Sequence, residues 1–177
     1  MEEILYLTGG NTKDKSTRQI TYDEAQKMLS DAQNNKESYK PICSMIILKK
    51  GEMYRKVIYF TFQMISVDLD TTKQVWYNKV SENEYFIDKI VYHNFNKQNI
   101  YLEMHFRDRT FSDPNICMIR MQGEKDWKYY VGDIEDTLFY RTIKFGEIDS
   151  VYNDLDTSFE SYLHNVQKCD KRFIRKK

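Results

Sequence analysis

The stretch from Ile42 to Val67 constrains the fold of this chain more than any other part of it. Two runs rich in β-branched and aromatic residues flank the sequence Lys-Lys-Gly-Glu, in which Gly51 provides the backbone freedom of a hairpin turn. In the second run, residues 57–65, one alternate set is wholly apolar and the other is mixed, which predicts a strand with one buried and one half-wet face. We therefore expect a hairpin at the centre of a mostly antiparallel sheet. The wholly apolar set, expected to be buried, is Ile58, Phe60, Phe62 and Met64.

Further strand-like segments follow one another along the chain. Between Ile100 and Phe106, apolar residues alternate with more polar ones, which is typical of a half-buried strand. The segment from Tyr85 to Tyr92 fits a strand or a helix, and its β-branched and aromatic residues favour a strand. The other expected strands cover residues 4–7, 75–77, 116–121, 127–131 and 137–145.

Capping boxes predict helices near both ends of the sequence. Thr21 and Glu24 have the spacing at which side chain and backbone exchange hydrogen bonds at a helix start, so we expect a helix from Tyr22 to Gln33. Thr157 and Glu160 repeat this spacing, and apolar residues follow them at the i, i+3, i+4 and i+7 positions of an amphipathic helix. Those apolar residues are Phe159, Tyr162, Leu163 and Val166.

Taken together, these elements predict an α+β fold. Strands in series with helices only near the two ends favour a largely antiparallel, twisted sheet of about six to eight strands. We expect the N-terminal helix and the C-terminal amphipathic helix to pack on this sheet. A chain of 177 residues suits one domain, which we expect to span residues 1–167, followed by a basic and frayed tail over residues 168–177.

The charge balance and the missing motifs exclude several classes of protein. Lys plus Arg and Asp plus Glu both number 27, so the usual electrostatic case for a nucleic-acid-binding protein is missing. The phosphate-loop pattern GxxxxGK[ST] and the dinucleotide pattern GxGxxG are absent, so we expect no cofactor. No signal-peptide pattern opens the chain, and no apolar run approaches the ~18 residues of a membrane span. We expect a soluble cytosolic protein, in a bacterium or in the host cell of a virus.

The cysteines and histidines show no spacing typical of a metal or redox site. The three cysteines contain no CxxC pair, which argues against a disulfide framework and favours a reducing compartment. Cys43 and Cys117 each lie in an apolar run, so we expect buried and inert thiols. The histidines fall on separate predicted segments, without the spacing of metal ligands, at His93, His105 and His164.

A polar stripe along the strand after Ile100 suggests two functional alternatives. Glu103, His105 and Arg107 lie at alternate positions and share one face of that strand. In a small hydrolase or transferase, these side chains would supply an acid, a base and an anion clamp. In a binding protein, Tyr101, Arg107 and Arg109 would form a contact surface, where Tyr and Arg are favoured. The third alternative is an ordinary solvated face of a sheet.

Acidic residues gather between residues 133 and 160, where eight of them stand against only Arg141 and Lys144. Such a segment suits a protein partner with a basic surface. Alternatively, the acidic segment and the basic tail fold close together and neutralise each other. The acidic residues that we expect to contact a partner are Asp133, Glu135, Asp136, Glu147 and Asp149.

The sequence Thr-Ser-Phe-Glu-Ser-Tyr-Leu at residues 157–163 resembles the closing "SFEEFL"-type helix of the SUKH superfamily of bacterial toxin-immunity proteins. The resemblance covers seven of 177 residues. It implies an α/β sheet fold and a protein that binds and neutralises a toxin. The family's N-terminal helical segment, which ends in an Asn-Gly-Gly-type turn, has no counterpart, because Gly9-Gly10 precedes the first helix. The resemblance therefore carries over no site residues.

The sequence thus predicts a non-enzymatic protein-binding inhibitor that acts by occluding its partner, either as a toxin-immunity protein or as a phage or viral antagonist of host defence. One alternative is the small hydrolase or transferase built on Glu103, His105 and Arg107. The other is a structural or assembly protein that forms homo-oligomers through a sheet edge or face.

Overall fold

The computed structural model describes residues 1–10, 13–32, 39–69, 73–81, 83–95, 100–105, 115–121, 128–132, 142–147 and 167–168. Over these residues the chain forms one antiparallel sheet of 12 strands and one α-helix. The elements in chain order are β1 (Glu2–Thr8), β2 (Gln19–Ile20), α1 (Tyr22–Asp31), β3 (Cys43–Lys49), β4 (Glu52–Tyr59), β5 (Gln63–Asp68), β6 (Lys73–Lys79), β7 (Glu84–Phe95), β8 (Ile100–His105), β9 (Asn115–Met121), β10 (Lys128–Gly132), β11 (Thr142–Lys144) and β12 (Gln167–Lys168).

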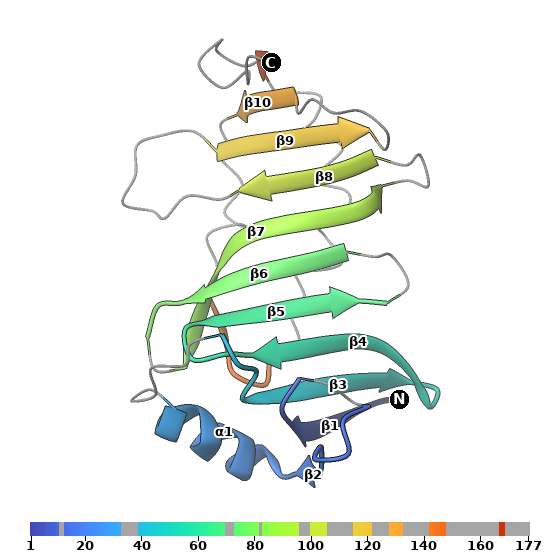
Figure 1. Cartoon of the computed structure of the whole chain (residues 1–177), viewed down its shortest axis with the longest axis vertical. Helices are drawn as coiled ribbons and strands as arrows, with labels where there is room; N and C mark the ends of the chain where they lie inside the picture. The colour runs from blue at the N-terminus through green and yellow to red at the C-terminus, as the bar shows by residue number, and fades with distance from the viewer. Residues whose placement is uncertain are drawn as a thin grey trace.

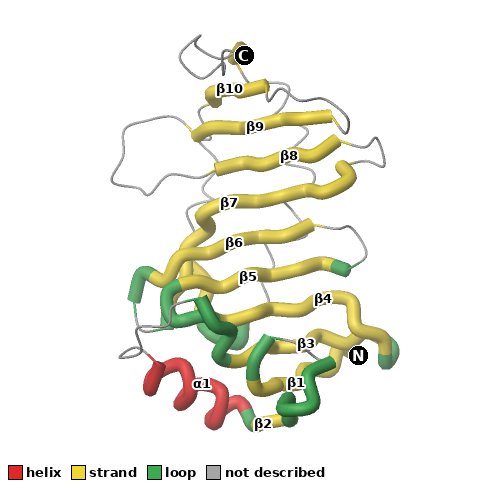
Figure 2. Tube along the Cα trace, in the orientation of Figure 1, coloured by secondary structure: helices red, strands yellow, loops and turns green. Residues whose placement is uncertain are grey.

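The sheet is a long ladder in which chain neighbours from β3 to β10 are also spatial neighbours (Figure 1). β1 adds to β3 at one end and carries the short β2, β12 pairs with β10 at the other end, and β11 pairs with β7. Eight of the strands have six or more residues, in agreement with the predicted number, and the four short strands extend the sheet beyond it. Figure 2 shows α1 at the β1 end of this ladder.

The predicted antiparallel sheet with an N-terminal helix is confirmed. The expected C-terminal helix falls at residues 157–166, outside the described residues. Lys168, which the sequence assigned to a frayed tail, pairs with Tyr130 in the short β10–β12 ladder. The boundaries of the single domain stay a prediction.

The hairpin around Gly51 is confirmed as the β3–β4 connection. Lys50 and Gly51 both have positive φ, at 55° and 80°, the combination of a two-residue type I′ turn, which matches the twist of paired strands. Its expected position at the centre of the sheet is wrong. Among the described strands, seven follow β4 in the sheet order, whereas only β1 and β2 lie beyond β3, so the hairpin sits near one end.

The expected single strand over residues 57–65 is also wrong, because the chain reverses within it. β4 ends at Tyr59 and β5 begins at Gln63. The Phe60 N–H donates to the Gln63 carbonyl at 2.8 Å, and the Phe62 carbonyl accepts from the Lys79 N–H of β6 at 2.8 Å. The reversal contains none of the Gly, Pro, Asn or Asp residues that normally mark a turn, which is why the pattern concealed it.

This reversal changes which side chains of the stretch are buried. Val57 and Tyr59, placed on the half-wet face by the alternation, are buried. Of the set expected to be buried, Met64 is buried, Ile58 is half-buried and Phe62 at the turn is 56% exposed. The alternation assumed one strand over residues 57–65, so it predicted the wrong buried face for the residues that belong to β4.

Helix α1 begins where its capping box predicts. The Thr21 hydroxyl accepts from the Glu24 N–H at 3.2 Å, and the Thr21 N–H donates to the Glu24 carboxylate at 2.8 Å. The helix ends at Asp31, before the expected end at Gln33, which lies outside the described residues. Ala25 and Leu29 are buried and join the core, so one stripe of α1 faces the sheet.

The main core lies on the face of the sheet that α1 covers, which we call the helix-side face. It combines this face with Ile20, Ala25 and Leu29 around α1 and with Ile143 and Phe145. The register of the strands places its buried sheet residues on this one face. They are Cys43, Met45, Ile47, Val57, Tyr59, Met64, Val75, Tyr77, Tyr85, Ile87, Ile90 and Tyr92.

Farther from α1, the helix-side face carries charged side chains that are also buried. Arg55 and Lys73 are only 5% and 2% exposed. Arg55 stands opposite Asp68 in the β4–β5 register, and the Lys73 ammonium lies 5.8 Å from the centroid of the Tyr92 ring. These charged residues are therefore buried beside the apolar core, because Arg55 pairs with Ile47 and Lys73 pairs with Tyr92.

Candidate functional site

An aromatic cluster lies where α1 meets the sheet. Phe145, directly after β11, is at its centre, with its ring centroid 4.7 Å from that of Tyr59, 5.3 Å from Tyr22 and 6.1 Å from Tyr6. Tyr85 of β7 joins through Tyr59 at 6.0 Å, in an edge-on arrangement favoured by the charge distribution of aromatic rings. The cluster therefore links α1, β1, β4, β7 and the segment after β11.

The segment of residues 142–147 is fixed by several specific contacts. β11 pairs with the first residues of β7, and the Phe145 N–H donates to the Asn83 carbonyl at 3.2 Å. The Gly146 N–H donates to the Tyr59 hydroxyl at 3.3 Å. Gly146 has a φ of +80°, and a Cβ there would lie 2.7 Å from Cε2 of Tyr22. Only glycine suits this close approach, which holds Phe145 beneath the helix.

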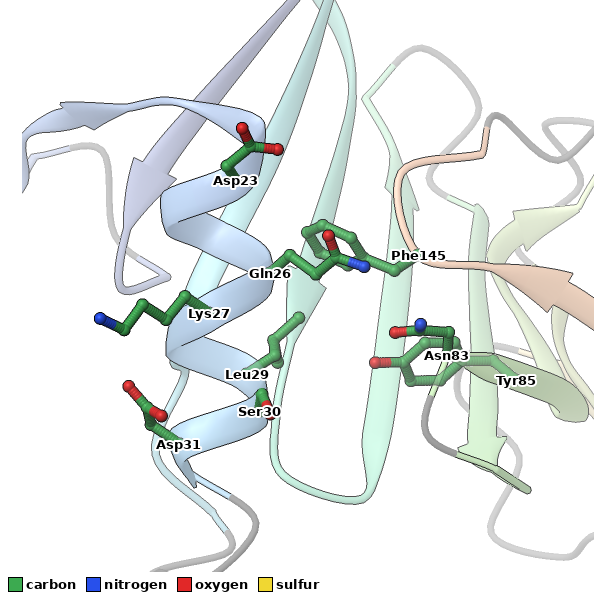
Figure 3. A pocket seen from close by; sticks show the side chains of 9 residues that line it. All are labelled: Asp23, Gln26, Lys27, Leu29, Ser30, Asp31, Asn83, Tyr85 and Phe145. Carbon is green, nitrogen blue, oxygen red and sulfur yellow. The ribbon is translucent and has the colours of Figure 1, made fainter.

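Between α1 and the start of β7 is an open cavity of ≈ 320 Å³, which we call the α1 hollow (Figure 3). Its floor is made of the buried side chains of Leu29, Tyr85 and Phe145, and the exposed or half-buried polar residues form its rim. Figure 3 shows Gln26 and Leu29 extending from α1 towards Phe145 and Tyr85. The rim residues are Asp23, Gln26, Lys27, Ser30, Asp31 and Asn83.

The Tyr85 hydroxyl is the most distinctive group of the α1 hollow. The residue is 1% exposed, and its hydroxyl points across the hollow towards α1 (Figure 3). Within the described part of the chain, no hydrogen bond engages this hydroxyl. Burial raises the pKa of Tyr85, so the phenol stays protonated at neutral pH and can both donate and accept.

The stripe predicted around Glu103 lies on β8, on the far side of β7 from the α1 hollow. The Glu103 carboxylate is 3.4 Å from the ammonium of Lys89 on β7, and that ammonium lies 4.5 Å from the centroid of the Trp76 ring. His105 pairs with Lys89 in the β7–β8 register, and Tyr101 is also in β8. Arg107 and Arg109 lie outside the described residues. The structure thus joins Glu103 to Lys89 and Trp76, two residues that the sequence pattern did not include.

Of the five acidic residues expected to contact a partner, the structure describes Glu147. Its side chain is exposed, and its carboxylate accepts from the Lys144 N–H at 2.9 Å. Asp133, Glu135, Asp136 and Asp149 lie outside the described residues.

Cys43 is a buried packing residue, as the sequence predicts. It is 0% exposed, and its sulfur lies 4.0 Å from the carbonyl oxygen of Ala25. Burial raises the pKa of the Cys43 thiol to about 12, so it is protonated at neutral pH and unsuited to nucleophilic chemistry. Cys117 lies in β9, and Cys169 is outside the described residues.

Comparison of the chain with protein-family models, curated proteins and solved structures gives no significant match. Among the residues that the structure describes, no three His, Cys, Asp or Glu side chains gather as a metal site. Within the same residues, no helix has the length and apolar character to cross a membrane.

Sequence reasoning did not find the α1 hollow. Its lining comes from α1, from Asn83 and Tyr85 beside the start of β7, and from Phe145 after β11. The capping box at Thr21 predicted the helix, but no local pattern indicates that Phe145 returns to it. The sequence feature that could have indicated a cluster of aromatic rings is its high content of Tyr and Phe, with 14 and 10 residues.

Proposed function

We propose that the protein is a non-enzymatic binding protein that neutralises a protein partner by occlusion, and that the α1 hollow belongs to its contact surface. The carrying observation is a floor formed by the buried side chains of Leu29, Tyr85 and Phe145, inside a rim of exposed and half-buried polar residues. Binding energy at protein interfaces concentrates in pockets that take one anchor side chain, and a ring of polar contacts excludes water around it. The α1 hollow has the size and layout of such a pocket.

The charge around the α1 hollow favours a basic partner. α1 carries acidic residues in its first turn and none of its last-turn residues is basic. Asp23 and Asp31 stand on the rim beside a single cation, Lys27, and Glu24 is 3.6 Å from Arg18. Complementary charge accelerates encounter and suppresses wrong partners. The sequence hypothesis of an acidic contact surface at Asp133, Glu135, Asp136, Glu147 and Asp149 extends this proposal.

The enzymatic alternative is less well supported by the described side chains. Glu103 is engaged by Lys89, which in turn lies over Trp76, and the Cys43 thiol is buried and protonated. A carboxylate held in an ion pair and a thiol without a base lack the arrangement of general acid–base or nucleophilic catalysis.

A homo-oligomer is the second candidate, because β1 has a partly open edge. Its residues Tyr6 and Leu7 pair with β2, whereas Glu2 to Leu5 pair only with β3 among the described strands. An open strand edge is a template for pairing with another chain. Light scattering tests this candidate, because a strict monomer at micromolar concentration would remove it.

The proposed function is tested by affinity capture from a cytosolic lysate of the cells that encode the protein, at low and moderate salt. We compare the wild type with Asp23→Lys/Asp31→Lys on the hollow rim. The matched control is Glu3→Lys/Glu52→Lys, which makes the same charge change at exposed residues away from the hollow. We expect one near-stoichiometric partner, captured by the wild type and the control, lost from the rim variant, and inhibited when the purified proteins are mixed at equal concentration. Elution of the wild type alone as a monomer would contradict the proposal.

A further inference from the structure

A second, much smaller cavity lies on the helix-side face, where the segment of residues 142–147 meets strands β3 to β6. Its volume is ≈ 10 Å³, and every residue that lines it is buried except Glu147. Half of the lining residues are polar, namely Arg55, Ser66, Tyr77 and Glu147. This polar lining is unusual for a cavity inside an apolar core, so we asked what the cavity could bind.

The register of the sheet brings the polar residues together. Arg55 of β4 stands opposite Asp68 of β5, so Ser66, two residues before Asp68, is its diagonal neighbour on the same face. Such neighbours lie about 7–8 Å apart, which is within reach of a long side chain. Glu147 approaches from the other side, directly after Gly146, whose N–H donates to the Tyr59 hydroxyl.

One nitrogen of the lining side chains is buried without a protein acceptor. It is the Nε of Arg55, which is shielded from solvent and donates no hydrogen bond within the described part of the chain. The Arg55 side chain has other interactions, and its guanidinium carbon lies 5.5 Å from the centroid of the Tyr54 ring. A buried N–H of this kind normally finds an acceptor in the protein or in an ordered water molecule.

The size and the charges of the cavity restrict what it can bind. One water molecule needs about 10–15 Å³ and two to four polar partners, and this cavity of ≈ 10 Å³ offers both. A chloride ion is larger than a water molecule and would face the Glu147 carboxylate, whereas a metal cation would face the Arg55 guanidinium. Burying an ion beside a like charge is strongly unfavourable.

We propose that this cavity binds one ordered water molecule, which accepts a hydrogen bond from the Arg55 Nε–H and donates to oxygen atoms of Ser66 and Glu147. Three hydrogen bonds are typical of a buried water molecule. The water joins β4 and β5 to the segment of residues 142–147, which carries Phe145 into the aromatic cluster. It is a structural ligand of the fold, and it does not depend on the proposed function.

NMR spectroscopy of the wild-type protein tests the proposal directly. Overhauser cross-peaks are recorded in the laboratory frame and in the rotating frame between water and the labelled methyl groups of Ile143 and Met64, which line the cavity. We expect cross-peaks at both methyl groups, with the opposite signs in the two frames that identify a long-lived internal water molecule. Absence of these cross-peaks from the spectrum of the folded protein would overturn the proposal.

Ser66→Thr assigns the water to this cavity, because it adds a methyl group at the cavity wall and keeps the hydroxyl. Ser44→Thr is the matched control, since Ser44 is also a buried serine of a strand but lies on the opposite face and does not line the cavity. Oxygen-17 relaxation dispersion counts the long-lived internal water molecules of each protein. We expect Ser66→Thr to lose the contribution of one water molecule and Ser44→Thr to retain it.

Equal dispersion from the wild type and from folded Ser66→Thr would overturn the proposal. If Ser66→Thr does not fold, the cross-peaks of the wild type at Ile143 and Met64 still decide it. None of these results bears on whether the affinity capture yields a partner, so the water site and the proposed function can fail separately.

Discussion

The two faces of the sheet are made from the same strands but are stabilised differently. On the helix-side face, Tyr59, Tyr77 and Tyr85 are each at most 1% exposed and pack among aliphatic residues. On the opposite face, Ile46, Phe86 and Val91 are also buried, but the charged pair Lys89 and Glu103 keeps 26% and 14% of its side-chain surface exposed. The strand alternation supplies both faces, and α1 with residues 142–147 covers only one of them.

This difference shows where the sheet derives its stability. Closely packed aromatic rings gain free energy from burial and shape complementarity, and they lose much of it when an atom is removed. Partly exposed ion pairs gain little, because water screens them and because ordering long side chains costs entropy. Substitutions in the aromatic packing of the helix-side face should therefore have effects several times larger than substitutions of the Lys89–Glu103 pair on the opposite face.

The largest effect is expected at Tyr59, in the centre of the helix-side face. Tyr59→Ala should lower the free energy of unfolding by about 3–5 kcal/mol, because it opens a cavity beneath Phe145. Tyr59→Phe keeps the ring and removes the hydrogen bond from Gly146, so it should cost only about 1 kcal/mol. Urea denaturation measures both. Equal losses in the two variants would show that the hydroxyl, and not ring packing, controls this site.

Gly146 is the next most sensitive position. Gly146→Ala forces a side chain into a left-handed backbone and against Tyr22, and we expect a loss of roughly 2–4 kcal/mol. Gly51→Ala is the matched control, because Gly51 also has a φ of +80° but a Cβ there meets nothing within 4 Å. It should cost about 1–2 kcal/mol. If denaturation gives the same loss for both glycines, crowding by the aromatic cluster is not important.

An effect of similar size, spread over several pH units, should appear in the alkaline pH dependence of stability. The Cys43 pKa is raised from its ordinary 9.0 to about 12, so the unfolded chain loses this proton first as pH rises. The stabilisation is complete below pH 9.0 and should fall by roughly 1.4 kcal/mol per pH unit between the two values. In Cys43→Ala, urea denaturation from pH 8 to 11 should give a shallower decline. Parallel curves for the two proteins would show that this thiol is not shielded from solvent.

The smallest effect is expected on the opposite face. A double-mutant cycle with Lys89→Ala and Glu103→Ala should give a coupling free energy of about 0.5 kcal/mol, reduced further in high salt. A coupling above ~2 kcal/mol would remove the contrast between the faces. It would also direct attention back to the stripe of Glu103, His105 and Arg107.

The local parts of this fold were predictable, and the parts that depend on distant residues were not. The capping box at Thr21 located the start of α1, and Gly51 located the first hairpin, because the residues concerned are close in sequence. The reversal at Thr61 and Phe62 escaped because the neighbouring β6 stabilises it through the Phe62 carbonyl, without any turn-forming residue.

The α1 hollow could not be predicted for the same reason. Its floor exists only because Ile143 pairs with Tyr85, which brings Phe145 back to a helix formed by residues near the start of the chain. Cys43 was predicted to be inert from its apolar neighbours alone, because burial of that strand follows from local composition. The role of Phe145 follows from long-range pairing, which a single sequence does not reveal.

The sequential order of the strands from β3 to β10 also has a consequence for how the protein assembles. Each of these strands pairs with the strand that precedes it in the chain, so it can join the sheet as soon as it has been synthesised. The sheet from β3 to β10 therefore has the low contact order of a fast-folding structure. The hydrogen bond from Gly146 to Tyr59, in contrast, joins residues 87 positions apart. The aromatic cluster and the α1 hollow should therefore be completed last, after a nascent chain has formed most of its sheet.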